Sequence, residues 1–202
     1  MEVLTIFQII ILILSVVIHE VAHGYAALWM GDVTAKYAGR LTLNPIKHLD
    51  PVGSIILPAI LIMFNSSFIL GWAKPVPYNP YNLRNKRWGE LVVAIAGPIS
   101  NILLALLISL VVRLYPGGLS MAFVEIAFIA VLINLFLALF NMIPIPPLDG
   151  SKILFNLFPG FALKYRTRME MSGPFLLIIF VMFFSSFLAP VAFYIARLMT
   201  GF

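Results

Sequence analysis

Five long apolar runs restrict the folds that this chain can adopt. They cover residues 3–30, 52–70, 91–114, 121–143 and 174–198. A helix that crosses a bilayer needs about 20 mostly apolar residues, and most of these runs are long enough. Because only 10% of the 202 residues are charged, against roughly 25% in soluble domains, a soluble globular fold is close to excluded. We expect a single all-α, polytopic membrane domain over residues 1–202.

The second run differs from the others because Pro51, Gly53, Pro58 and the polar residues 65–67 interrupt it. If residues 52–70 span the membrane, the basic residues divide almost evenly between the two sides. If these residues instead dip in and return, eleven of the 13 Lys and Arg side chains share one side, with Arg113 and Arg197 opposite. Cytoplasmic loops carry an excess of such residues, so the second topology is preferred. It has four spanning helices, one re-entrant segment and an N-terminus outside the cell.

The net charge of +5 is also explained by basic residues in the cytoplasmic loops. In a soluble chain it would suggest a nucleic-acid partner, but here it reflects basic loops at a bilayer surface. We therefore expect a multi-pass protein of the cell membrane with the lipid bilayer as its surroundings and no nucleic-acid partner.

A polar cluster lies inside the first apolar run, where residues 19–23 read HEVAH. In a helix, His19 and His23 lie on one face with Cβ atoms about 6 Å apart, so both can reach one metal ion. Glu20 is placed to take a proton from a water molecule at that ion. Charged groups deep in a spanning helix are costly and usually mark function. The pattern thus predicts a catalytic metal site.

Catalytic zinc sites have three protein ligands and an open position for water. Cysteine is absent, so the third ligand must be His48 or a carboxylate. Asp149 is a candidate because it follows a proline-rich run that ends the fourth apolar stretch and cannot continue a regular helix. His48, in a basic loop, is more typical of a surface or capping histidine.

Several motifs together resemble the site-2 protease family of intramembrane zinc metalloproteases. They are HEVAHG at 19–24, AGPISN at 96–101 and NMIPIPPLDG at 141–150. Two further stretches, GRLTLNP at 39–45 and GWAKPVP at 71–77, look like the compact bacterial and archaeal subgroup. The order and spacing of these motifs, over most of the chain, make the resemblance specific.

The resemblance implies roles for individual residues. His19, His23 and Asp149 would bind one zinc ion, and Glu20 would be the catalytic base. Asn101 would help to bind the substrate. The family also carries short membrane-associated β-strands beside the site, for which residues 36–43 and 71–77 are the candidates. In this reading, residues 31–90 hold the loop, the strands and the re-entrant segment. The Asp-Gly element at 141–150 then delivers the third ligand.

The implied activity is that of a zinc metalloendopeptidase in regulated intramembrane proteolysis. It would hydrolyse a peptide bond within or near the transmembrane segment of a substrate protein, with its active site towards the cytosol. Two alternatives remain at this point. One is a metal-ion transporter that uses the His/Glu/Asp cluster as a transit site. The other is an inactive relative that serves as a binding scaffold. The absence of an internal repeat speaks against the transporter, and the intact set of candidate catalytic residues speaks against the scaffold.

Overall fold

The computed structural model describes residues 2–56, 60, 63, 72–115 and 117–201, and it is built from helices. The long helices are α1 (Glu2–Trp29), α4 (Lys86–Leu114), α5 (Met121–Asn141) and α7 (Pro159–Thr200). The shorter ones are α2 (Thr34–Tyr37) and α6 (Asp149–Leu157), the 3-10 turns η1 (Pro45–His48) and η3 (Pro80–Asn82), and the π-helical turn η2 (Pro51–Ile56).

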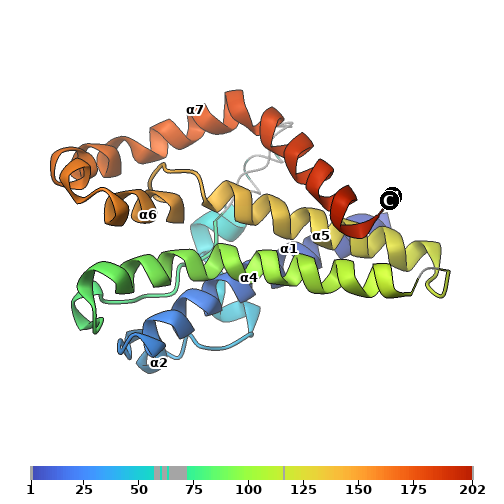
Figure 1. The fold of residues 1–202 in the computed structure, drawn as a ribbon, viewed down its shortest axis with the longest axis horizontal. Coiled ribbons are helices and arrows are strands. Elements are labelled where there is room, and N and C mark those ends of the chain that lie inside the picture. The colour runs from blue at the N-terminus through green and yellow to red at the C-terminus, as the bar shows by residue number, and fades with distance from the viewer. Residues whose placement is uncertain (1, 57–59, 61–62, 64–71, 116, 202) are drawn as a thin grey trace.

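Helices α1, α4 and α5 pack against one another and form the centre of the molecule, with α7 on α5 (Figure 1). Ser15 of α1 contacts Asn134, and His19 and His23 contact Asp149, so α1 and α5 run in the same direction. Helix α4 runs the opposite way, because its Asn101 meets His19 while its earlier residue Val93 meets His23. This arrangement brings the motif helix, the middle of α4 and the end of α5 together.

Small side chains let the helices approach closely. One buried cluster lies between α4, α5 and α7 and consists of Ala105, Val131, Leu135, Ala192 and Ala196. In a bilayer, where lipid chains are as apolar as leucine, close packing of small residues drives helix association. Many large apolar side chains remain exposed on the outer faces, for example Ile6, Leu107 and Phe183. Such faces suit lipid contact.

Within the described residues, three helices are long and apolar enough to cross a membrane, namely Leu4–Trp29, Trp88–Leu114 and Met121–Asn141. A fourth is counted if α7, which bends by 67° between Pro159–Phe183 and Ser186–Thr200, forms one span. The chain is thus a multi-pass membrane protein. The last helix was expected over 174–198, but α7 begins earlier, at Pro159. Proline is well tolerated in the first turn of a helix, so Pro159 is compatible with this start.

The segment between α1 and α4 begins and ends at the same end of the bundle. The Arg84 N–H donates to the carbonyl oxygen of Met30 at 2.8 Å, just past α1 and just before α4. Asp32, fully buried, ties these parts together by accepting from Thr34, the Asn79 N–H and Asn82. The predicted re-entrant run 52–70 falls mostly outside the described residues, which include only 52–56, 60 and 63 of it. Those residues that are described fit a segment without a net crossing.

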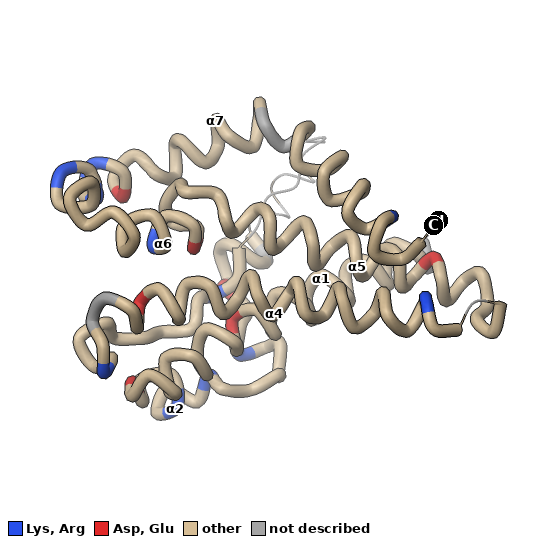
Figure 2. Tube along the Cα trace, viewed as in Figure 1, with Lys and Arg blue, Asp and Glu red and all other residues tan. Residues whose placement is uncertain are grey.

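Basic residues gather at this same end. Figure 2 shows Lys and Arg concentrated around α2, α6 and the start of α7. The end of α4 and the end of α7 lie at the opposite end, where Arg113 donates to the Leu198 carbonyl oxygen. The charge asymmetry that the sequence suggested therefore exists in three dimensions.

The predicted β-strands are wrong for the described part of the chain, where no strand forms. Residues 36–43 contain the end of α2 and a turn in which Gly39 has a φ of 63°. Residues 72–77 belong to no helix or strand, and Pro75 and Pro77 have no N–H to donate to a partner strand. The N–H of Lys74 instead bonds to the His48 carbonyl oxygen, and the N–H of Val76 bonds to a side chain.

Candidate metal centre

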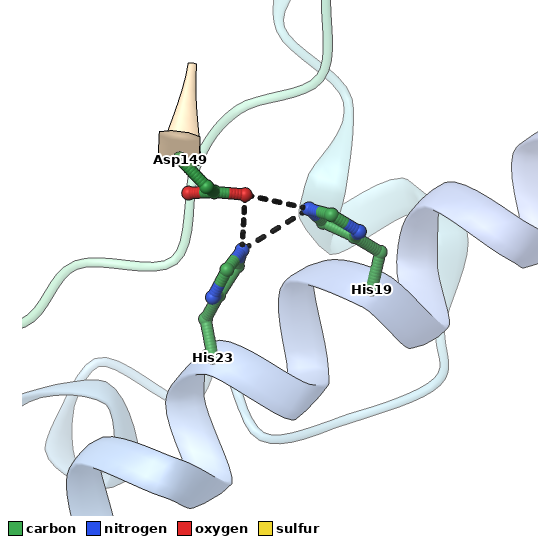
Figure 3. A group of neighbouring side chains, drawn as sticks. All are labelled: His19, His23 and Asp149. Atoms are coloured by element: carbon green, nitrogen blue, oxygen red, sulfur yellow. Dashed lines mark hydrogen bonds and ion pairs between the residues drawn. The ribbon is translucent and has the colours of Figure 1, made fainter. Parts of the chain in front are cut away.

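Three ligand-type side chains from two distant parts of the chain meet inside the bundle. Figure 3 shows His19 and His23 on α1 pointing towards Asp149. One oxygen of Asp149, Oδ2, lies 3.2 Å from Nε2 of His19 and 3.1 Å from Nε2 of His23. The two Nε2 atoms are 3.1 Å apart, and all three residues are buried. Ligands at 2.0–2.1 Å around a tetrahedral zinc ion are about 3.3 Å from one another. These spacings are therefore close to those of a zinc site.

The outer nitrogens of both imidazoles have partners that determine which ring nitrogen carries the proton. His23 Nδ1 lies 2.6 Å from the carbonyl oxygen of Val93, which can only accept, so Nδ1 must donate. His19 Nδ1 lies 2.6 Å from Oδ1 of Asn101. In a neutral imidazole, a donating Nδ1 leaves Nε2 with its lone pair. Two such lone pairs and a carboxylate oxygen then face one another in a buried place, an arrangement that a bound metal cation would stabilise.

Asn101 belongs to a buried polar network rather than to an open surface. It is fully buried, and its Nδ2 donates to Oδ1 of Asn134 at 2.9 Å. Asn134 in turn donates to the Ser15 hydroxyl at 3.0 Å and to the Ala130 carbonyl oxygen. This network links α1, α4 and α5 and determines the orientation of the Asn101 amide. Asn101 thereby contacts His19 from the side away from Asp149.

Gly97 lets α4 pass next to the two histidines. A Cβ atom at this position would lie 2.5 Å from Nε2 of both His19 and His23. Any side chain there would occupy the space in front of the ligand atoms. Gly97 belongs to the AGPISN motif, which by itself does not indicate a role for the glycine. Its position relative to α1 could not be seen from spacing along α4 alone.

The turn region between α5 and α6 positions Asp149. Pro144, Pro146 and Pro147 end the helical path, and α6 begins at Asp149 itself. A side chain at Gly150 would collide with the backbone of Met142, so this turn needs a glycine. The other carboxylate oxygen, Oδ1, lies 3.4 Å from Nζ of Lys152, one helical turn further along α6. This contact was not among the predicted ones, although the i, i+3 spacing of Asp149 and Lys152 in a helix could have indicated it.

The charge state of Asp149 suits a ligand. Burial raises the pKa of its carboxyl group, but His19, His23 and the positive charge of Lys152 lower it by more. The pKa lies well below its usual range. The carboxylate therefore remains ionised at neutral pH, as metal binding requires.

Glu20 lies beside the three-residue group but is not part of it. Its Oε2 accepts the N–H of Val76, in the segment 72–77, at 2.8 Å. This contact holds the carboxylate in one orientation next to His19 in the helix. Because Gly24 would collide with Leu41 and Val76 if it carried a Cβ, the same segment packs closely on α1.

His48 does not join the site. Its ring is buried rather than on the surface, and its Nε2 lies 2.8 Å from the Thr42 carbonyl oxygen, so of the two expected roles the contact fits a capping histidine. Within the described residues, the group that could hold a metal consists of His19, His23 and Asp149. Asp149 rather than His48 is the third member.

The known proteins that match this chain all indicate the same family. A family model for peptidase family M50 matches residues 7–122 and 117–185. YwhC of Bacillus subtilis is 40% identical over 196 residues, which cover 94% of this chain and 83% of YwhC. Rip2 of Mycolicibacterium smegmatis is 33% identical over 139 residues, covering 68% of this chain and 52% of Rip2. Each of the two is named a "Putative zinc metalloprotease". No solved structure matches the chain.

Proposed function

The chain belongs to peptidase family M50 and is an intramembrane zinc metalloprotease, and we propose that His19, His23 and Asp149 hold its single zinc ion. The observation that carries this proposal is the convergence of two Nε2 lone pairs and Asp149 Oδ2 within 3.1–3.2 Å. The outer hydrogen bonds of both rings support the same assignment. A bound zinc ion polarises a substrate carbonyl and makes water a stronger nucleophile.

Glu20 is the catalytic base in this proposal. It takes a proton from the attacking water and then gives it to the amine of the leaving fragment. The Val76 N–H bonds to Oε2 of Glu20, and among the described residues no hydrogen bond involves Oε1, which can accept the proton. Because only the Oε2 atom of the carboxylate is engaged by this bond, the group is oriented without losing its capacity to accept a proton.

The substrate we propose is a membrane-spanning segment of another protein. Three observations support it: the ligand group lies between apolar helices, α1 and α4 are candidate spans, and the non-helical segment 72–77 contacts Glu20 through Val76. A helical peptide hides its amides in internal hydrogen bonds. The substrate must therefore unwind locally before Glu20 and the metal can act on it.

We place the active site towards the cytosol. The basic end of the bundle, where α2, α6 and the start of α7 lie, is the end that the positive-inside rule assigns to the cytoplasm (Figure 2). Asp149 begins α6 at this end, and α1 carries its histidines in its second half. A polar path from the cytosolic side then brings water to the site.

The proteolytic function is tested with the purified chain in vesicles and a membrane-spanning peptide. Cleavage gives two fragments whose masses sum to that of the peptide plus one water. The transporter alternative is not favoured, since the family and the named relatives are metalloproteases. Zinc flux across the vesicle membrane that survives Glu20→Gln, without any fragments, would support a transporter instead.

Asn101 offers a prediction that separates two roles. Its hydrogen bond to His19 Nδ1 favours a role in orienting that ligand, whereas the family resemblance implies substrate binding. For the orienting role, Asn101→Leu should weaken zinc binding by roughly 10–100-fold, as other changes to the partners of metal-bound histidines do. Competition with a chromogenic chelator measures the affinity.

The matched control is Asn134→Leu, which alters the same polar network without touching His19. We expect it to affect zinc affinity less than Asn101→Leu does. If Asn101→Leu raises the KM for the peptide and leaves zinc affinity unchanged, Asn101 binds substrate and does not orient the ligand.

A further inference from the structure

A second polar feature lies away from the metal centre, in the segment that joins α1 and α4. It is a pocket of about 450 Å³ whose lining includes Arg40, Lys47 and Lys74, beside Ile46 and Leu49. We call it the basic pocket. It has three positive charges, and no acidic residue is among its described lining residues. Three cations that converge without a carboxylate repel one another, so the arrangement favours binding of an anion.

Arg40 is the unusual member of the basic pocket. Its residue is 7% exposed, although arginine is almost never buried without a partner. Its Nη2 donates to the carbonyl oxygens of Lys74 and Pro75, at 2.7 and 3.3 Å. Its Nε is buried and has no hydrogen-bond partner among the residues that the structure describes. Burying a cation with an unused donor and no counter-charge costs free energy. A bound anion would accept a hydrogen bond from Nε and would neutralise the positive charge.

The donors fit a phosphate group. A guanidinium presents its N–H groups in a planar fork that matches phosphate oxygens, and lysine ammonium groups add charge from flexible stems. Lys47 and Lys74 are exposed, so their ammonium groups can close over a ligand held by Arg40. We propose that the basic pocket binds a phosphate group, and that an anionic phospholipid of the surrounding bilayer supplies it.

The position of the pocket supports a lipid as the source. Its residues lie between the end of the span Leu4–Trp29 and the start of the span Trp88–Leu114, at the basic end of the bundle. Large apolar side chains beside it are exposed, with Leu43 at 61% and Ile46 at 73%. Exposed apolar residues next to cations are typical of a surface that lies in the headgroup region.

The basic pocket is also connected to the catalytic base through residues 74–76. Arg40 holds the carbonyl groups of Lys74 and Pro75, and the next residue, Val76, donates to Glu20. A ligand that binds Arg40 would therefore stabilise the segment that orients Glu20. The lipid would thus belong to the assembled site rather than to the general lipid shell.

Binding can be measured without any cleavage. The purified full chain in non-ionic detergent is titrated calorimetrically with short-chain phosphatidylglycerol, with phosphatidylcholine of the same chain length, and with inorganic phosphate. The decisive variant carries Lys47→Gln and Lys74→Gln, because both side chains are exposed and the fold does not depend on them. The control carries Lys36→Gln and Lys164→Gln, which remove the same charge from exposed positions outside the pocket. Arg40→Gln is added after its helicity has been compared with that of the wild type.

We expect one phosphatidylglycerol per chain, with phosphatidylcholine much weaker. The Lys47/Lys74 variant should bind phosphatidylglycerol roughly tenfold or more weakly, because each basic residue near an anionic surface contributes substantially to affinity. The control variant should stay within about twofold of the wild type. Equal phosphatidylglycerol binding by the wild type and the Lys47/Lys74 variant would overturn the proposal. Inorganic phosphate that binds as tightly as phosphatidylglycerol would overturn the lipid source while keeping a phosphate site.

Discussion

Replacing Glu20 by glutamine is expected to lower the rate of peptide cleavage by about 10²–10⁴-fold, the usual contribution of a general acid–base group. The zinc content should stay the same, because Glu20 is outside the His19, His23 and Asp149 group. The fold should also persist, since the glutamine carbonyl oxygen can accept the Val76 N–H just as Oε2 does. Cleavage of a membrane-spanning peptide and zinc per chain are measured on the same preparation.

Glu125→Gln is the matched control for this substitution. Glu125 also lies in a candidate span, in the first part of α5, but outside the metal-binding group. Its replacement should leave cleavage unchanged. Full activity of the Glu20→Gln protein would remove Glu20 from the mechanism.

Replacing Asp149 by alanine is expected to abolish stable zinc binding and with it proteolysis. Two ligands remain, and Lys152 loses its carboxylate partner, so a positive charge is left beside the two histidines. The affinity should fall by more than the roughly 10–100-fold that changes to outer partners of a ligand cause. The zinc content of the purified variant, measured by elemental analysis, checks this.

Asp50→Ala is a suitable control, because Asp50 accepts only local backbone N–H groups near the start of η2. It should retain about one zinc per chain. If the Asp149→Ala protein keeps the same zinc content as the wild type, Asp149 is not a ligand and another residue must complete the site.

Much of this arrangement could be predicted from the sequence, because some of its signals are local. The spacing of His19 and His23 places them on one helix face wherever that helix lies. The proline-rich run before Asp149 predicted a break in the helix, and the break occurs there. The four long apolar runs outside residues 52–70 all became helices, with ends that shifted by several residues. Apolar length and helical spacing are properties of the chain itself.

Contacts between distant segments could not be predicted in the same way. The bond between the Val93 carbonyl oxygen and His23 depends on the register of α4 against α1, which no local pattern encodes. The role of Gly97 depends on the same register. The strands expected at 36–43 and 71–77 failed for a different reason. The resemblance to the family implies strands there, but the prolines and Gly39 of this chain disfavour a paired strand.

Asn101 shows how a motif can be identified while its role stays open. Its amide was expected near the active site, and the structure places it against His19. The structure shows that it contacts Nδ1, the outer nitrogen of the His19 ring, on the side away from Asp149. The zinc affinity of its variants therefore tells more about its role than activity alone.

The central claim, that this chain cleaves peptides with one zinc ion, is tested most directly by removing and restoring the metal. The purified wild-type chain is stripped with a chelator, and zinc content and cleavage of a membrane-spanning peptide are followed together as zinc is returned. We predict that cleavage disappears with the metal and returns in full at about one zinc per chain. Cleavage at the full rate by zinc-free protein would contradict the account.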